Sequence, residues 1–210
     1  MRLITEIVHP KLASTQGRVF RRHAARGIVL RDEQILLLFT ERYNDFSFPG
    51  GGLDGDEDIV TGLKRELEEE TGAREIQVLQ HYGYIEEYRP DVKPGYDLMH
   101  MTSHFYLCEI GPYLEPVKME SHEIANGMRP VWVNLAEAIS HNEAVMQRQE
   151  SSMGQCIQRE TFMLRRSHRN HRGEVRLGRQ IGLKGVRNTL SPIIAVCLNR
   201  ERGMLTALLW

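Results

Sequence analysis

The chain has 210 residues, enough for one core domain with an extension or for two small domains. Hydrophobic residues make up 41%, charged residues 26%, and the net charge is −1, so the composition is that of a soluble globular protein and favours no class of partner. No apolar run approaches the ~18 residues that cross a bilayer, and residues 1–17 do not resemble a secretory signal. We therefore expect no membrane partner and a cytoplasmic location.

Periodicity and turn-forming residues predict the elements along the chain. In order, they are strands over Ala24–Arg31 and Gln34–Thr40, a loop over Pro49–Gly52, a helix over Glu57–Thr71, strands over Glu75–Tyr88, Met99–Glu109 and Pro130–Val133, and a helix from Asn134 to about Met146. Strands and helices alternate without a regular βαβ repeat. The pattern therefore predicts an α/β fold of the α+β type, with a mixed sheet flanked by helices.

The predicted helix over Glu57–Thr71 carries an unusual run of acidic residues. Glu66, Glu69 and Glu70 stand at i, i+3 and i+4, so their side chains leave the helix on one face. Like charges at this spacing destabilise a helix by roughly 0.2–0.5 kcal/mol per pair. A bound hard cation reverses that repulsion, and carboxylate oxygens suit Mg²⁺ or Mn²⁺ rather than zinc.

An isolated acidic run is usually a solvated helix face, but here the flanking residues fit one known pattern. The probability of a chance match is on the order of 10⁻⁹ per starting position at ordinary residue frequencies. The matching residues are Gly51, Glu57, Arg65, Glu66, Leu67, Glu69, Glu70, Gly72 and Ala73. With these residues the sequence resembles the Nudix (MutT-like) hydrolase family, whose box reads G-x5-E-x7-R-E-U-x-E-E-x-G-U with U apolar. The resemblance extends over roughly residues 20–145.

The resemblance implies a fold and a reaction. The fold is an α/β/α sandwich with a loop–helix–loop catalytic motif. The reaction is a magnesium-dependent (or manganese-dependent) pyrophosphohydrolase reaction, in which the pyrophosphate bond of a small nucleoside diphosphate derivative is cleaved. Metal ions can neutralise the diphosphate, activate water and stabilise the leaving phosphate.

The resemblance also implies roles for single residues. Metal ligands are expected at Glu66, Glu69 and Glu70, with backbone groups of Gly51 exposed beside the metal. Arg65 is expected to orient a glutamate through an ion pair. Structural support for the motif is expected from Glu57 and Gly72.

The general base of such enzymes varies and often lies outside the box. Glu120 and Glu123 precede the strand over Pro130–Val133, and we favour Glu123 because it lies nearer to that strand. Catalysis by Glu69 or Glu70 as the base stays open.

Substrate contacts are less well defined by the sequence. Arg42 is a candidate for a phosphate contact, and Phe48 and Tyr88 are candidates for stacking on a base. Pro90 lies near a proline of ADP-ribose-cleaving relatives, whereas Tyr88 lies near a tyrosine of relatives that cleave dinucleoside polyphosphates. The two indications disagree, so the substrate stays open.

The carboxy-terminal part differs in charge from the rest. Residues 157–202 hold eleven Arg or Lys against three Glu. We expect a Nudix domain over residues 1–164 and a basic extension over 165–210 that is irregular or loosely attached. The extension is compatible with RNA binding through Arg165, Arg166, His168, Arg169, His171 and Arg172.

Two alternatives to a small-molecule hydrolase therefore stay open. One is a nucleic-acid-binding or ligand-sensing regulator built on the same fold, and the other is an RNA-cap pyrophosphohydrolase that uses the extension. A homodimer is also compatible with the sequence. The odd number and wide spacing of Cys108, Cys156 and Cys197 predict reduced thiols.

Overall fold

A computed structural model describes residues 1–90 and 93–180, with side chains as far as His171. The chain divides into two units, Met1–Phe162 and Met163–Trp210. The elements are β1 (Leu3–Val8), β2 (Val19–Arg31), β3 (Gln34–Thr40), β4 (Asp45–Ser47), α1 (Ile59–Thr71), β5 (Gln77–Pro90), β6 (Leu98–Glu109), α2 (Ser121–Ala125), β7 (Met128–Asn134), α3 (Leu135–Arg148) and α4 (Ile157–Gln180).

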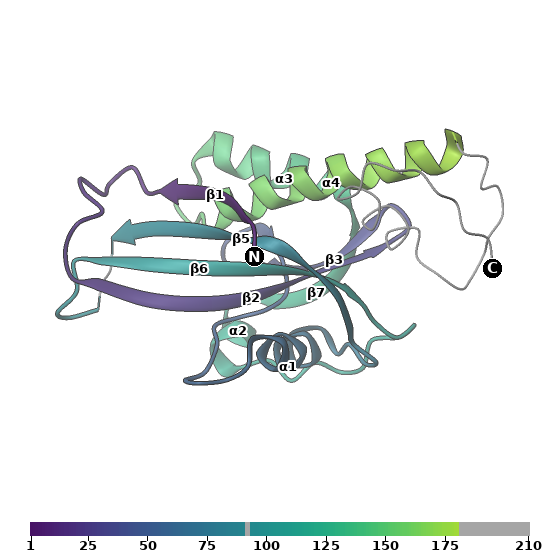
Figure 1. Cartoon of the computed structure of the whole chain (residues 1–210), viewed down its shortest axis with the longest axis horizontal. Helices are drawn as coiled ribbons and strands as arrows, with labels where there is room; N and C mark the ends of the chain where they lie inside the picture. The colour runs from purple at the N-terminus through teal and green to yellow at the C-terminus, as the bar shows by residue number, and fades with distance from the viewer. Residues whose placement is uncertain (91–92, 181–210) are drawn as a thin grey trace. The chain divides into compact units, whose positions relative to one another are not determined.

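The strands of the first unit form one mixed sheet (Figure 1). Within the described residues it has seven strands, six of them in the order β1-β5-β6-β2-β3-β4, while β7 pairs with β3. The pairs β1–β5 and β2–β6 are parallel, and β2–β3, β3–β4, β3–β7 and β5–β6 are antiparallel. The mixed sheet predicted from the sequence is confirmed.

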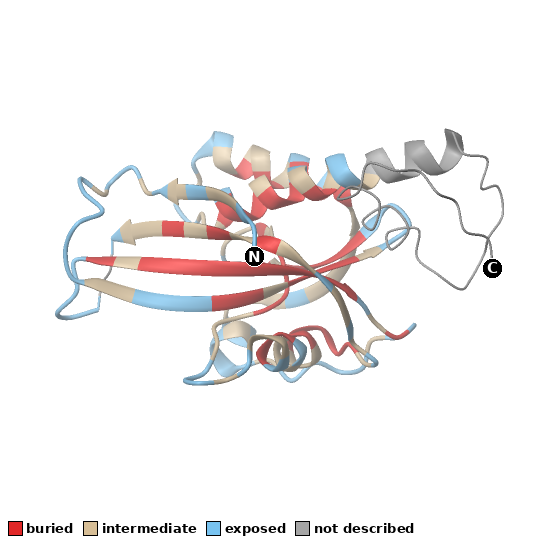
Figure 2. Ribbon diagram, in the orientation of Figure 1, coloured by how far each residue is buried: buried red, intermediate tan, exposed pale blue. Residues whose placement is uncertain are grey.

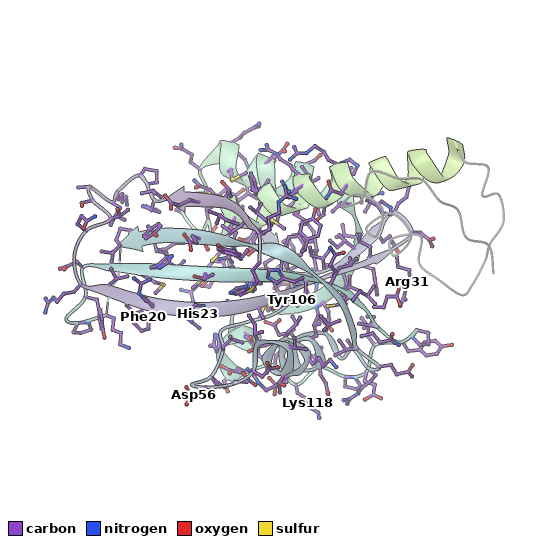
Figure 3. The ribbon with its side chains drawn as sticks, viewed as in Figure 1. Phe20, His23, Arg31, Asp56, Tyr106 and Lys118 are labelled. Carbon is purple, nitrogen blue, oxygen red and sulfur yellow. The ribbon has the colours of Figure 1, made fainter. Side chains whose placement is uncertain are left out.

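Helices cover both faces of this sheet, α1 and α2 on one side and α3 on the other (Figure 1). Strand β6 is buried over nearly its whole length (Figure 2). On the α1 face, Leu63 and Leu67 are fully buried in a cluster with Tyr106, which lies between the sheet and α1 (Figure 3). A Cβ at Gly27 would lie only 2.9 Å from Leu67 Cδ2, so this glycine lets α1 approach β2 closely.

Most predicted elements are found within a few residues of their expected bounds. The predicted helix over Glu57–Thr71 is α1, which starts two residues later at Ile59 because the Asp58 carboxylate caps the amides of Val60 and Thr61. Four elements were not among those predicted: β1, which pairs with β5, the short strand β4, the short helix α2, and α4. No helix in residues 1–90 and 93–180 is long and apolar enough to cross a membrane.

The prediction that the chain becomes irregular after about Leu164 is wrong for the described part. Helix α4 continues without a break to Gln180. Arginine is a strong helix former, so a run rich in arginine can be helical without an obvious apolar period. Residues 181–210 of the predicted extension, with Cys197, lie outside the described residues.

The end of α1 generates a stability prediction. Gly72 has φ +71° and accepts no side chain without overlap, because a Cβ there would collide with the carbonyl of Glu115. We expect Gly72→Ala to lower the free energy of unfolding by at least about 1 kcal/mol, measured by urea denaturation. Gly55→Ala is the matched control, because Gly55 also has positive φ (+48°) but no atom within 4 Å of its Cβ position. Equal losses in both variants would contradict the steric explanation.

Candidate active site

The glycine loop, residues 49–53, runs alongside β2. The amides of Ala25 and Gly27 donate to the carbonyls of Gly51 (3.0 Å) and Pro49 (2.9 Å), and the amide of Leu53 donates to His23 (3.0 Å). These backbone bonds place the loop between β2 and α1. The loop is thus hydrogen-bonded to β2 as a strand would be, although its own backbone is not a regular strand.

Arg26 fixes the same loop from its side chain. Its Nη1 donates to the carbonyls of Phe48 (3.2 Å) and Gly50. Its Nε is buried and makes no hydrogen bond with any described residue. Arg26 lines the pocket, and its Nε is a buried donor without a partner in the described part of the chain.

Two glycines in the loop lie directly against the carboxylates of α1. Gly50 has φ +125°, and its amide donates to Glu70 Oε2 at 2.5 Å. A Cβ at Gly51 would lie 2.6 Å from the carboxyl carbon and both carboxyl oxygens of Glu66. Gly51 therefore lies directly beside Glu66, and the absence of a side chain is what permits this contact.

Arg65 forms the centre of an ion-pair network at the mouth of the site. It donates from Nε and Nη2 to both oxygens of Glu57 (3.0 and 3.1 Å), and from Nη1 to Glu66 Oε1 (3.0 Å) and Glu69 Oε2 (3.1 Å). The hydrogen bonds from Arg65 hold the pKa of Glu57 below its ordinary value. Arg65 thus lies where it can orient Glu66, and Glu57 anchors Arg65 in turn.

The acidic residues of α1 face a cavity of about 850 Å³, within the usual range for small-ligand sites. Strands β2 and β3, helices α1 and α2, the loop 151–156 and the first turn of α4 line it. Glu66, Glu70 and Glu123 all lie on its wall. The side chain of Glu69 does not, because it turns toward Arg65 and is 40% exposed.

Burial makes the ionised forms of two of these carboxyls unfavourable. Desolvation raises the pKa of Glu66 above its ordinary value, although Arg65 and Arg26 oppose the shift. Desolvation raises the pKa of Glu70 to about 8, opposed by the Gly50 amide and Arg26 and reinforced by Glu66 and Glu123. The carboxyls of Glu66, Glu70 and Glu123 therefore lie close enough to repel one another. Among the described residues, however, no three Asp, Glu, His or Cys side chains already converge at metal-binding distance.

Both candidate bases lie on the pocket wall, in or next to α2. Glu120 caps α2, and its amide donates to Glu123 Oε2 at 2.7 Å. Of these two candidates, Glu123 is the one whose charge raises the pKa of both Glu66 and Glu70. The second oxygen of Glu123 makes no hydrogen bond with a described residue.

The three substrate-contact candidates are placed differently. Arg42 lines the pocket and donates to Asn126 Oδ1 at 3.0 Å. Phe48 has 0% exposure and packs edge-to-face on Phe105, so its side chain is part of the core. Tyr88 stacks on His100 and is not among the lining residues. Phe48 and Tyr88 therefore do not reach the pocket in this structure, because both aromatic rings pack against neighbours on the sheet.

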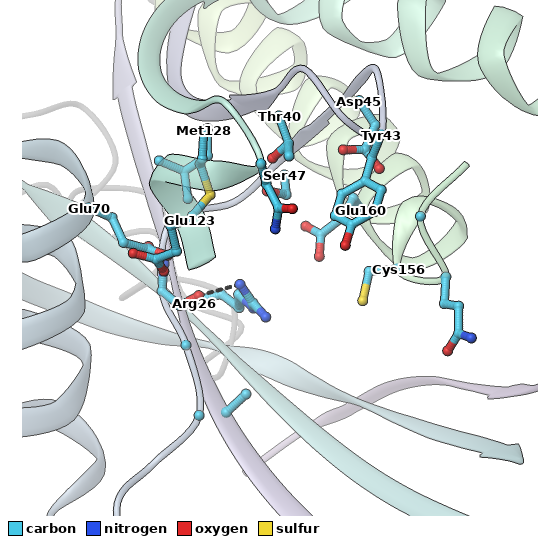
Figure 4. Close-up of a pocket in the computed structure, with 18 of the residues that line it drawn as sticks. Arg26, Thr40, Tyr43, Asp45, Ser47, Glu70, Glu123, Met128, Cys156 and Glu160 are labelled. Atoms are coloured by element: carbon cyan, nitrogen blue, oxygen red, sulfur yellow. Dashed lines mark hydrogen bonds between the residues drawn. The ribbon is translucent and has the colours of Figure 1, made fainter. Parts of the chain in front are cut away.

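Sequence reasoning missed the opposite wall of the pocket, which contains Asp45 and Glu160 (Figure 4). Glu160 is 1% exposed; it accepts from the guanidinium of Arg159 and from the amide of Phe48 at 3.0 Å. Arg159, also 1% exposed, pairs in addition with Glu87 of β5. The one signal in the sequence was the Arg159-Glu160 pair at the start of an otherwise apolar stretch.

The mixed sheet thus places the glycine loop and the acidic residues of α1 beside one pocket. The sequence model of the NUDIX domain matches residues 21–155. The chain therefore belongs to the Nudix family and is a Nudix hydrolase, which confirms the resemblance inferred from the box. No curated protein matches the chain.

Solved structures of low identity have a similar fold. A NUDIX hydrolase from Nitrosomonas europaea is 18% identical, with a TM-score of 0.46, over 61% of this chain and 85% of that chain. A MutT NUDIX hydrolase from Burkholderia pseudomallei is 22% identical, with a TM-score of 0.40, over 56% of this chain and 85% of that chain. An ADP-ribose pyrophosphatase from Streptococcus suis is 19% identical, with a TM-score of 0.39, over 55% of this chain and 75% of that chain. The family assignment rests on the domain match and not on these structures.

Asp45 generates a prediction on stability and pH. Its burial, together with the charge of Glu160, raises its pKa from 3.8 to about 6. Because the folded-state pKa lies above the unfolded value, ionisation of Asp45 lowers the free energy of unfolding. The loss grows from about pH 4 to pH 6 and is complete above about pH 6. We expect Asp45→Asn to be more stable than the native protein above pH 6, by up to about 3 kcal/mol, and equally stable below about pH 4.

Thermal denaturation of both proteins at pH 8 and pH 4 measures this difference. Asp32→Asn is the matched control, because Asp32 is exposed and asparagine tolerates its φ of 55°. A stability difference between Asp45→Asn and the native protein that does not change with pH would contradict the burial argument.

Proposed function

We propose that the chain is a divalent-metal-dependent hydrolase that cleaves the pyrophosphate bond of a small nucleoside diphosphate derivative. One observation carries this proposal: three carboxylates, Glu66, Glu70 and Glu123, face the same cavity as Arg26, whose Nε has no partner in the described part of the chain. Oxygen donors of this kind bind a cation, and the cationic side chain binds an anion. A ligand that carries both a phosphate group and a metal ion satisfies both.

The donor set fits a hard divalent cation. Its atoms are carboxylate oxygens that burial and mutual repulsion keep in an unfavourable state, and a cation would relieve both effects. Glu66 and Glu70 are the ligands that the geometry supports best, beside the backbone of Gly51. Glu69 can join them only if its side chain leaves Arg65. When bound, Mg²⁺ or Mn²⁺ would neutralise the diphosphate and polarise its phosphorus–oxygen bonds.

The protein's own residues supply the remaining functions. Arg26 binds and orients a phosphate oxygen through its guanidinium, which lines the pocket, and Arg65 keeps Glu66 in place. Glu123 accepts a proton on its unbonded oxygen from the water that attacks phosphorus. The bond between that phosphorus and the bridging oxygen breaks, and the leaving phosphate takes the electron pair.

The first functional prediction concerns the ligands. We expect Glu66→Gln and Glu70→Gln to lower turnover at least ~10²-fold, because the positioned metal charge contributes several kcal/mol to the transition state. The measurement is hydrolysis, with and without EDTA, of nucleoside triphosphates, ADP-ribose, nucleotide sugars, dinucleoside polyphosphates and capped RNA. Glu68→Gln is the control on the same helix, because Glu68 pairs with Arg74.

Undiminished turnover in EDTA, or in both variants, would refute the metal-dependent mechanism. Glu69→Gln then decides the size of the ligand set: a comparable loss includes Glu69, and normal turnover limits the set to Glu66 and Glu70.

The second functional prediction concerns the base. Glu123→Gln keeps a carbonyl oxygen for the amide of Glu120, so α2 stays capped while the proton acceptor is lost. We expect kcat to fall ~10²-fold or more with Mn²⁺ affinity nearly unchanged. Glu120→Gln is the comparison, and a loss confined to it would transfer the role to Glu120. No loss in either variant would return the role to Glu69 or Glu70.

A further inference from the structure

The pocket has two acidic walls. Glu70 and Glu123 lie together on one side, and Asp45, Tyr43 and Glu160 lie on the other (Figure 4). The first wall is the proposed site of the metal ions and the diphosphate. The second wall has no role in that reaction.

Asp45 is the unusual residue of the second wall. Its side chain lines the pocket, the residue is only 6% exposed, and its carboxylate makes no hydrogen bond or ion pair with any residue of the described part. Its charged neighbour is Glu160, which carries the same sign and whose oxygens are already used by Arg159 and the Phe48 amide. A buried carboxylate without a donor is costly, so the missing donor points to a ligand.

The Asp45 carboxylate lies against a loop on one side. Gly154, in the loop 151–156, lies against it: a Cβ there would be 2.9 Å from Asp45 Oδ2. The loop thus backs the carboxylate on one side, while its other side faces the cavity. The Asp45 carboxylate is therefore an acceptor group at that end of the pocket.

The position of this wall indicates which part of a nucleotide reaches it. Phosphate is excluded by like charge, and the ribose adjoins the diphosphate at the first wall. The base is the group farthest from the diphosphate. A carboxylate binds two parallel N–H donors in one bidentate contact, and guanine presents such a pair in N1–H and its 2-amino group. Adenine presents an acceptor at N1 beside its amino group.

We propose that Asp45 selects a base whose edge carries two adjacent N–H donors, the arrangement found in guanine. This inference rests on the proposed function, because it takes the first wall as the place of the diphosphate. It makes Asp45 a specificity-determining residue and assigns no catalytic step to it.

The test is the binding of GMP, IMP and AMP to the full-length protein in the presence of Mg²⁺, by calorimetry. None of the three has a pyrophosphate bond, so the result does not depend on hydrolysis. We expect GMP to bind about 10- to 100-fold more tightly than IMP, which lacks the 2-amino donor, since one charge-assisted hydrogen bond accounts for that ratio. AMP should bind more weakly still.

Variants separate this role from a structural one. Asp45→Asn replaces one acceptor by a donor, so we expect the GMP-to-AMP ratio to fall at least ~10-fold while AMP binding is kept or improved. Gly154→Ala should lower the same ratio by displacing the carboxylate. Asp32→Asn should leave it unchanged. Similar affinities for the three nucleotides, no measurable GMP binding, or an unaltered ratio in Asp45→Asn would overturn the proposal, even if pyrophosphate hydrolysis is confirmed.

Discussion

The site depends on the contact between the glycine loop and β2. Backbone hydrogen bonds from Ala25 and Gly27 fix the loop to the strand, and the Arg26 side chain binds two carbonyls at its start. The loop then presents the Gly50 amide to Glu70 and leaves space at Gly51 for Glu66. The sheet thereby determines where the carboxylates of α1 lie, although none of those carboxylates belongs to the sheet.

The same arrangement accumulates buried charge that the protein does not fully neutralise. Glu66, Glu70 and Asp45 all have pKa values raised mainly by burial. Elsewhere the chain does neutralise buried acids: Arg159 pairs with both Glu87 and Glu160. Asp45, by contrast, has no arginine partner in the described part of the chain, and Glu66 is paired only with the partly exposed Arg65. Marginal stability is the expected consequence of such a site.

The sequence predicted what local patterns determine. The box lies within about twenty positions, so spacing predicted that Glu66 and Glu70 share one helix face and that the helix ends before Gly72, whereas the cap at Asp58 was not predicted. It did not predict contacts that join distant segments, such as Glu160 with the Phe48 amide, 112 positions away. Phe48 and Tyr88 were misplaced for the same reason, because each ring packs on a residue of β6 that is distant in the sequence, Phe105 and His100 respectively.

The second wall of the pocket is encoded in two places, because Tyr43 and Asp45 lie inside the segment that matches the Nudix domain and Glu160 lies outside it. The carboxylates of α1 lie inside the segment that matches the Nudix domain, residues 21–155, whereas Arg159 and Glu160 lie beyond it, in the first turn of α4. Glu160 reaches back to the amide of Phe48, just before the glycine loop, so the added helix supports the shared motif as well as the second wall. A family that keeps one cleavage site and changes its substrates can do so in this way. Under the proposed function, the box would hold the diphosphate, and β4 and α4, which lie outside the box, would determine what is attached to it.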